Sequence, residues 1–186
     1  INDTNFYLKR IRLQINLTRP PLGQIFIFSE ELHLPDTQAY LHGVSVSTRS
    51  MHRENALAKS TQFIHIAKQI RSELNNKANE VLLIGEEGDI LEGLSSNFFG
   101  VIHGKGWTAE KGVLHGITRK TVLLACDRCG VEVIRQPAHL EMLQALSEAF
   151  ITSASRGILP ISKIDGHDIG VARPGEVTKT LSLAFD

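Results

Sequence analysis

Alternation of hydrophobic and polar positions divides the chain into short strands and a few helices. Apolar and polar residues alternate from Phe6 to Asn16, which predicts a strand with one solvated face. Comparable signals predict further strands over Gln24–Ser29, residues 41–48, Glu80–Gly85, Asp89–Glu92, Asn97–Ile102, Trp107–Thr108, Val131–Arg135, Glu148–Thr152 and Ile158–Ile164. The strands between Glu80 and Thr108 are separated by short turns that contain glycine, so they indicate a β-meander.

Helical spacing predicts four helices. One stripe predicts a helix of about four turns that Ser60 or Thr61 can cap; it consists of Phe63, Ile66, Ala67, Ile70 and Leu74. A second helix is expected to begin with Thr118 as its cap and to end at Gly130, followed by a short helix over Leu140–Leu146 and a closing helix from Pro174. The mixture predicts an α+β fold, with a barrel-like mixed sheet and flanking helices.

Composition and charge argue against some classes of binding partner. The chain has 186 residues, of which 42% are hydrophobic, enough for one good core or two small ones. Twenty Lys and Arg balance twenty Asp and Glu, and the longest apolar runs fall short of the ~20 residues that a membrane-spanning helix needs. We therefore expect a soluble protein with no nucleic-acid or membrane partner. The first residue is Ile1 rather than methionine, which leaves targeting open.

The two cysteines are predicted to be structural. They suit a reducing compartment and form a C-x-x-C pair, Cys126 and Cys129, at the C-terminal end of a predicted helix. There the helix dipole disfavours a redox-active thiolate. A zinc site would require two more ligands, and none stands nearby at the usual spacing. We expect core packing and no metal site.

Two charged residues are candidates for chemistry. Lys59 stands just before a predicted helix, where a partly desolvated amine can act as a nucleophile, although a solvated surface lysine is the ordinary alternative. Glu92 ends a predicted strand, and the small, polar turn that follows it leaves room for a ligand to approach the backbone. An exposed turn carboxylate is the alternative for Glu92.

Two further segments are candidates for an anion site. Gly116-Ile117-Thr118 stands at a predicted helix start, whose backbone N–H groups can bind a phosphate or can simply be capped. The turn Thr152–Gly157 gathers hydroxyls and the Arg156 guanidinium at a strand end, where they can hold an anion or form an ordinary polar turn. Together the four segments hold the groups that an aldehyde cofactor with a phosphate needs.

In their order along the chain, these segments resemble the class IV aminotransferases. This family comprises the fold-type IV pyridoxal-phosphate enzymes, among them branched-chain and D-amino-acid aminotransferases and aminodeoxychorismate lyase. The similarity runs from about Arg53 to Thr180, and the similar stretches are AKST at 58–61, EVLLI at 80–84, GDILEGLSSNFF at 88–99, VLHGITR at 113–119, EAFITS at 148–153 and ILPI at 158–161. The resemblance implies the fold of D-amino-acid aminotransferase.

The resemblance also implies roles for individual residues. Lys59 would form the Schiff base with pyridoxal phosphate and move the substrate Cα proton, and Glu92 would keep the pyridine nitrogen protonated. The backbone N–H groups of Ile117 and Thr118 would hold the phosphate. The other cofactor-binding residues implied are Asn97, Leu114, Gly116, Ser153, Ala154 and Ser155. Many relatives carry threonine where this chain has Ala154, so the backbone and Ser153 or Ser155 would serve there.

The implied function is amino-group transfer between an amino acid, branched-chain or of D configuration, and a 2-keto acid. The alternatives are the lyase, which releases pyruvate in the synthesis of 4-aminobenzoate for folate, and a non-catalytic domain of the same fold. Residues 60–63 replace the Gly-Asn-Tyr pattern of branched-chain enzymes, which favours the D-amino-acid and lyase side. A homodimer in the cytoplasm is expected from the resemblance.

The start of the chain departs from the family. Family members carry an N-terminal α+β domain of roughly a hundred residues, which supplies a phosphate-binding arginine and much of the substrate pocket. Residues 1–50 are expected to be the remnant of that small domain and the crossover, and residues 51–186 the cofactor-binding domain. The chain as given would then hold half of an active site.

Overall fold

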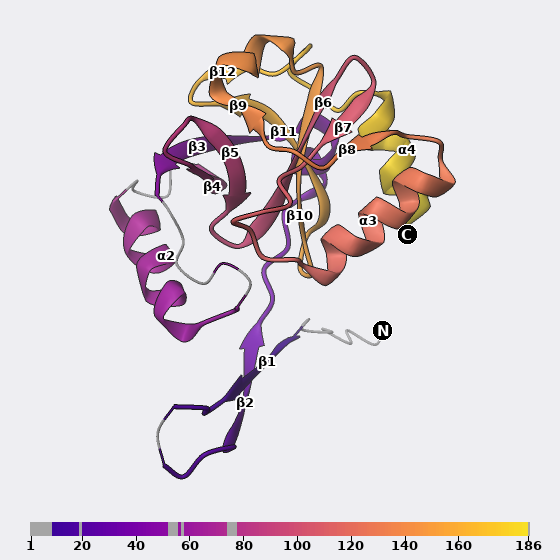
Figure 1. Cartoon of the computed structure of the whole chain (residues 1–186). Helices are drawn as coiled ribbons and strands as arrows, with labels where there is room; N and C mark the ends of the chain where they lie inside the picture. Colours follow the sequence, from indigo (N-terminus) through magenta and orange to yellow (C-terminus); the bar gives the residue numbers. More distant parts are fainter. Residues whose placement is uncertain (1–8, 19, 52–55, 57, 74–77, 186) are drawn as a thin grey trace, which may run out of the picture. The chain divides into compact units, whose positions relative to one another are not determined.

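The computed structural model describes residues 9–18, 20–51, 56, 58–73 and 78–185, and the chain divides into two compact units, residues 1–35 and 36–186. The first unit contains β1 (Lys9–Ile15) and β2 (Ile25–Glu31). The second unit contains, in order, α1 (Thr37–His42), β3 (Val44–Ser50), α2 (Thr61–Glu73), β4 (Glu80–Ile84), β5 (Asp89–Gly93), β6 (Ser96–Ile102), β7 (Lys105–Trp107), α3 (Ile117–Arg128), β8 (Val133–Ile134), β9 (Ala138–His139), the 3₁₀ helix η1 (Leu140–Ala145), β10 (Glu148–Ser153), β11 (Gly157–Ile164), β12 (His167–Asp168) and α4 (Glu176–Phe185) (Figure 1).

The first unit is an antiparallel hairpin. β1 and β2 pair from Lys9 opposite Glu31 to Ile15 opposite Ile25, which confirms the two predicted strands over their described residues. Leu13 remains 64% exposed. A two-stranded ribbon buries little apolar surface and is marginally stable in water on its own.

The second unit is built on a closed ring of strands. The ring runs β6-β10-β11-β3-β4-β5, and a further pairing of β5 with β6 closes it. β3 is parallel to both of its neighbours, whereas the other ring pairs are antiparallel. The predicted α+β fold with a barrel-like mixed sheet is confirmed. The antiparallel succession β4-β5-β6-β7 is the predicted meander.

The inside of the ring is filled by one apolar cluster. Successive side chains of a strand point to opposite faces, so alternate residues of each strand enter the cluster. Leu82, Phe98 and Ile151 are among its members and are at most 1% exposed. Because the ring has no open face, its strands consist of almost continuous apolar runs.

The intervening residues pack against helices outside the ring. Val81 and Leu83 of β4 lie in a cluster with α2, and Phe99 of β6 and Phe150 of β10 lie in a cluster with α3 and α4 (Figure 1). The Phe99 and Phe150 rings stack with their centroids 5.0 Å apart. The helices therefore cover two separate parts of the outer surface.

The helix predicted after Lys59 is present as α2, although Ile66 of the predicted stripe is 41% exposed and Leu74 lies outside the described residues. α2 buries Phe63, Ala67 and Ile70 against β4, and the Phe63 N–H donates to Ser60 Oγ at 3.4 Å, which confirms Ser60 as the capping side chain.

Several details of the prediction were wrong. The closing helix begins at Glu176 and not at Pro174, and of the strand predicted over Val131–Arg135 only Val133–Ile134 forms. The strand predicted over residues 41–48 begins only at Val44, because residues 37–42 form α1, with Asp36 Oδ1 accepting from the Ala39 N–H at 2.8 Å. Thr118 does not cap α3: the helix begins at Ile117, and Gly116 is the N-cap with no side-chain hydrogen bond. Thr118 lies within the first turn and is only 9% exposed.

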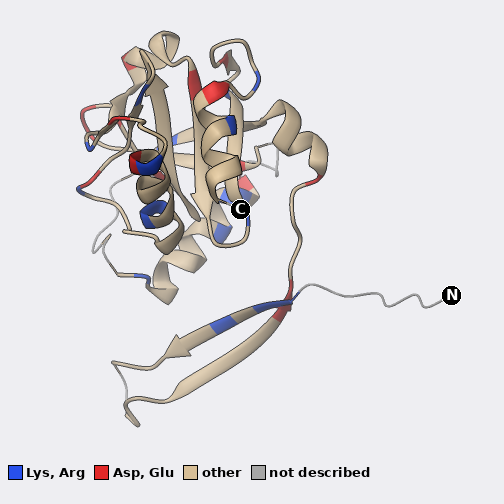
Figure 2. Cartoon of the chain, turned by 90° about the vertical axis from the view of Figure 1, so that its right-hand side faces the viewer, with Lys and Arg blue, Asp and Glu red and all other residues tan. Residues whose placement is uncertain are grey.

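Cys126 packs in the cluster with α3 and α4, as predicted. Burial, with a smaller contribution from Cys129, raises the pKa of its thiol to about 11. Among the residues that the structure describes, no group of three or more His, Cys, Asp or Glu could hold a metal ion. None of the described helices is long and apolar enough to cross a membrane. Acidic and basic residues are interspersed along the second unit (Figure 2).

Leu82→Ala should lower the free energy of unfolding by about 2 to 5 kcal/mol, because Leu82 is 0% exposed inside the ring and its truncation leaves a cavity. The matched control is Leu183→Ala in α4, where the leucine is 83% exposed and the expected change is within about 0.5 kcal/mol. Urea unfolding followed by circular dichroism measures both. Equal losses would contradict a packed ring interior.

Candidate functional site

A row of polar side chains lies where the ring closes. Glu92 of β5 stands opposite Asn97 of β6, and Asn97 stands opposite Thr152 of β10. Glu92 is also opposite Leu83, which packs under α2, and Thr152 lies two residues from Phe150, which packs under α3 and α4. The row therefore occupies the outer face of the ring between the two helix-covered regions.

The Glu92 carboxylate is buried and held by hydrogen bonds. Glu92 is 2% exposed, and its Oε2 accepts from the Leu114 N–H at 2.9 Å and from Asn97 Nδ2 at 3.4 Å. Asn97 Nδ2 also donates to the Leu114 carbonyl at 2.6 Å. A carboxylate fixed in this way can accept a charge-assisted hydrogen bond from a ligand cation.

Arg119 fixes the loop that carries Leu114. It is 4% exposed, and its Nη2 donates to the Ala109 carbonyl at 2.8 Å and to Glu110 Oε2 at 2.7 Å. The hydrogen bond from Arg119 is the main reason that the pKa of Glu110 lies below its usual value. The loop is thereby tied to the first turn of α3.

The start of α3 offers backbone N–H groups to a ligand. Gly116 precedes the helix without a side-chain cap, so the first-turn N–H groups at Ile117 and Thr118 point out of the helix end with no capping acceptor among the described side chains. A Cβ on Gly116 would stand 2.6 Å from Asn97 Oδ1. A side chain at residue 116 would therefore displace the Asn97 amide, whereas glycine leaves it in place, and the helix end is suited to an anion.

The turn after β10 lies beside the turn after Glu92. Arg156 Nε donates to Ser153 Oγ at 3.1 Å, and Arg156 Nη2 donates to Ser95 Oγ at 2.9 Å. Because the Ser153 hydroxyl already accepts from Arg156, its own hydrogen is free to donate to a ligand. In the same turn, Ala154 is exposed and Ser155 is half-buried.

Lys59 stands apart from these contacts. It is exposed, two residues before α2, and has no hydrogen bond or ion pair with the other predicted site residues among those described. α2 packs on β4, the neighbour of the strand that carries Glu92. The structure thus brings Glu92, Asn97, Leu114 and Gly116 into contact and places Lys59 at the start of the helix on the adjoining strand.

Two residues of the site were not singled out from the sequence. Thr152 counted only as part of a hydroxyl-rich turn, yet it is 1% exposed and its Oγ1 has no partner among the described residues. Glu80 was taken as an ordinary strand start, although it is 1% exposed. The available signal was a polar residue at the end of an otherwise apolar strand.

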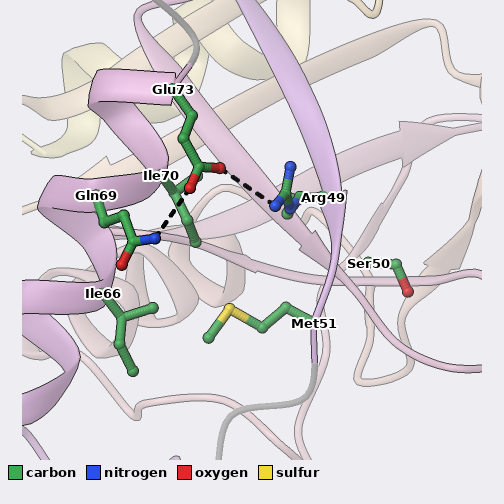
Figure 3. A pocket seen from close by; sticks show the side chains of 7 residues that line it. All are labelled: Arg49, Ser50, Met51, Ile66, Gln69, Ile70 and Glu73. Atoms are coloured by element: carbon green, nitrogen blue, oxygen red, sulfur yellow. Dashed lines mark hydrogen bonds and ion pairs between the residues drawn. The ribbon is translucent and has the colours of Figure 1, made fainter.

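A separate cavity of about 280 Å³ opens between the end of β3 and α2. Figure 3 shows Arg49 and Gln69 directed at Glu73, with Arg49 Nη2 3.2 Å and Gln69 Nε2 3.1 Å from its carboxylate oxygens. None of the predicted site residues lines this cavity. The ion pair that closes it is exposed, so the cavity offers no buried polar group to a ligand.

Residues 2–164 match the family model described as amino-transferase class IV. The chain belongs to the class IV aminotransferase family. The match spans every segment of the polar row, the start of α3 and the turn after β10.

Individual aminotransferases show the same similarity. Branched-chain-amino-acid aminotransferase of Pseudomonas aeruginosa is 28% identical over 155 residues, which are 80% of this chain and 50% of that protein. D-alanine aminotransferase of Bacillus licheniformis is 35% identical over 112 residues, 58% of this chain and 38% of that protein. The chain spans about half the length of the first of these relatives and less of the second.

A solved branched-chain amino acid aminotransferase has the same fold. The crystal structure of the T.th. protein, complexed with N-(5'-phosphopyridoxyl)-L-glutamate, aligns with a TM-score of 0.76 and 26% identity, over 88% of this chain and 56% of that chain. This likeness confirms the fold expected from the resemblance to class IV aminotransferases.

Gly116→Ala should speed amide hydrogen exchange at Leu114 by about tenfold, because the new Cβ displaces the Asn97 side chain that holds the loop. Gly85→Ala is the control, since the nearest atom to its Cβ would be an ordinary 3.6 Å away. Exchange followed by mass spectrometry of peptides over residues 109–118 measures the effect. Identical exchange in both variants would contradict the close approach of Gly116.

Proposed function

We propose that the chain forms the cofactor-binding part of a pyridoxal-phosphate-dependent aminotransferase. In this proposal residues 51–186 supply the cofactor domain together with the ring strand β3, and the rest of residues 1–50 is the end of a preceding small domain and the crossover. The observation that carries it is the buried Glu92 carboxylate, fixed by Leu114 and Asn97 beside an uncapped helix end. Family membership and the phosphopyridoxyl ligand of the T.th. relative support the choice of cofactor.

The groups at the site fit that cofactor. A pyridine nitrogen requires a carboxylate, which Glu92 provides, and a phosphate requires N–H and O–H donors, which Ile117, Thr118 and Ser153 provide. The buried Thr152 hydroxyl has no partner among the described residues, and its place in the row beside Asn97 suits a ligand polar atom.

Each residue then has a defined task. When bound, pyridoxal phosphate supplies an electron sink for the electrons released as the substrate's Cα–H bond breaks. Glu92 holds a proton at the pyridine nitrogen, and Lys59 Nζ takes the Cα proton and returns it to the acceptor carbon. The N–H groups at Ile117 and Thr118 orient the phosphate, while Leu114 excludes water from the ring.

Lys59 should be the residue that borohydride reduction labels. We expect a pyridoxyl group on Lys59 when the full-length natural protein is mixed with pyridoxal phosphate, reduced, digested and mapped by mass spectrometry. Lys59→Ala should abolish the label, whereas Lys179→Ala, an exposed lysine in α4, should keep it. Label scattered over surface lysines would remove Lys59 from its proposed role.

Glu92→Gln should leave attachment of the cofactor at Lys59 intact and slow turnover by about 100-fold, because an amide does not hold the pyridine proton. Glu132→Gln, at a glutamate whose side chain is 63% exposed, should turn over at the unmodified rate. Single-turnover kinetics monitored by cofactor absorbance separate chemistry from binding. An unchanged rate in Glu92→Gln would exclude the proposed role of Glu92.

We propose an amino acid and a 2-keto acid as substrates, with the amino acid either branched-chain or of D configuration, and a cytoplasmic homodimer as the working form. Relatives of both substrate classes are named aminotransferases, which favours amino-group exchange over pyruvate elimination. L-leucine or D-alanine should yield a new amino acid only when 2-oxoglutarate is present. Release of pyruvate from aminodeoxychorismate without an acceptor would indicate the lyase instead.

A further inference from the structure

A second buried carboxylate lies behind the proposed cofactor site. The side chain of Glu80, at the start of β4, is 0% exposed. Its Oε2 accepts from Arg156 Nη2 at 2.7 Å, from Ser95 Oγ at 2.7 Å and from Ser96 Oγ at 3.0 Å. Its Oε1 accepts from Arg71 Nη2 at 3.2 Å. A carboxylate with this many donors is fully satisfied without a ligand.

Glu80 is ionised in this setting. Burial raises the pKa of its carboxyl, but the charges of Arg156 and Arg71 and the hydrogen bonds from Arg156 and Ser95 outweigh burial, and the pKa lies below its usual value. The Arg156 side chain is itself only 14% exposed. Each ion therefore depends on the other, because removal of one partner leaves a desolvated charge without compensation.

The contacts of Glu80 connect separate segments of the proposed site. Ser95 belongs to the β5–β6 turn that follows Glu92, Ser96 is the first residue of β6, and Arg156 belongs to the turn after β10. A Cβ on Gly93 would stand 2.3 Å from Ser96 Oγ and 2.9 Å from Glu80 Cγ, so the β5–β6 turn packs directly on this carboxylate. One side chain thus fixes two turns that are far apart in the sequence.

Arg156 transmits this constraint to a predicted phosphate ligand. Its Nη2 binds Glu80 and Ser95, while its Nε donates to Ser153 Oγ at 3.1 Å. The planar guanidinium has a rigid donor geometry, so anchoring one edge at Glu80 sets the direction of the other. Acceptance of the Nε hydrogen leaves the Ser153 hydroxyl hydrogen directed away from Arg156.

We propose that Glu80 is a positioning residue for the cofactor phosphate: through Arg156 it orients the Ser153 hydroxyl and holds the turn after β10 against the turn after Glu92. This inference rests on the proposed function. Arg156 contacts Glu80 and Ser95 through Nη2 and Ser153 through Nε, so the proposal assigns it an indirect role, in which it positions Ser153 and does not bind the phosphate.

The test compares two probes that differ only in the phosphate, pyridoxal phosphate and pyridoxal. Their Kd values are measured by absorbance on the full-length natural protein and on Glu80→Gln, Arg156→Lys and the double variant. Arg156→Lys keeps a positive charge beside Glu80 but removes the Nε donor to Ser153. Asp168→Asn, which breaks the exposed Lys163–Asp168 ion pair at 2.7 Å, is the control.

We expect the preference for pyridoxal phosphate over pyridoxal to fall by about tenfold in each single variant, while the Kd for pyridoxal stays within about twofold. The preference of the double variant should equal that of the more affected single variant within about twofold, because both changes interrupt the same chain of contacts from Glu80 through Arg156 to Ser153. A purely structural role would weaken both probes alike, and that result overturns the proposal.

The remaining outcomes are also decisive. Loss of preference in Arg156→Lys alone would make Arg156 a direct phosphate ligand and overturn the role of Glu80. If Glu80→Gln fails to fold by circular dichroism, Arg156→Lys is combined with Ser153→Ala, because an arginine that acts only through Ser153 adds no further loss once the Ser153 hydroxyl is removed. A preference in this double variant equal to that of Ser153→Ala within about twofold supports the proposal, and additive losses or an unchanged preference in Arg156→Lys overturn it. Failure of the natural protein to take up pyridoxal phosphate at Lys59 would instead overturn the proposed function and this inference with it.

Discussion

The pairing of β5 with β6 is the constraint on which the second unit depends, because it turns an open sheet into a closed ring. Closure leaves no solvated sheet face, so apolar residues fill the inside and the helices cover most of the outside. The closing pairs are Glu92 opposite Asn97 and Gly93 opposite Ser96. The point at which the fold closes is therefore also the point at which polar side chains remain between the covering helices.

Buried charge in this region is tolerated because it is paired. Glu92 is held by a backbone N–H and an amide, and Glu80 by two arginines and two serines. Such groups are costly to bury alone and become rigid once satisfied. In the proposed function the two buried carboxylates serve different ends: Glu92 would face the cofactor ring, and Glu80 would fix the turns that surround the phosphate.

The sequence predicts most of the ring because the spacing of apolar residues along the chain shows which side chains are buried. α2, the meander β4-β5-β6-β7 and the strands β10 and β11 have strong apolar patterns, and the structure contains them. α1 was missed because six residues are too few for a helical period. Thr118 was mistaken for the cap because the apolar pattern shows only roughly where a helix begins. The choice of glycine at residue 116 depends on its close approach to Asn97, and a contact between distant segments is not visible in a local pattern.

The same distinction applies to the site. Glu92 and the Ile117–Thr118 segment could be proposed from local motifs, but Glu80 and Arg156 are 76 residues apart and only the fold joins them. The most direct test is a crystal structure of the full-length natural protein grown with pyridoxal phosphate. We expect density continuous from Lys59 to the cofactor, the ring nitrogen at Glu92 and the phosphate at Ile117, Thr118 and Ser153. A phosphate bound away from the start of α3 would contradict this expectation.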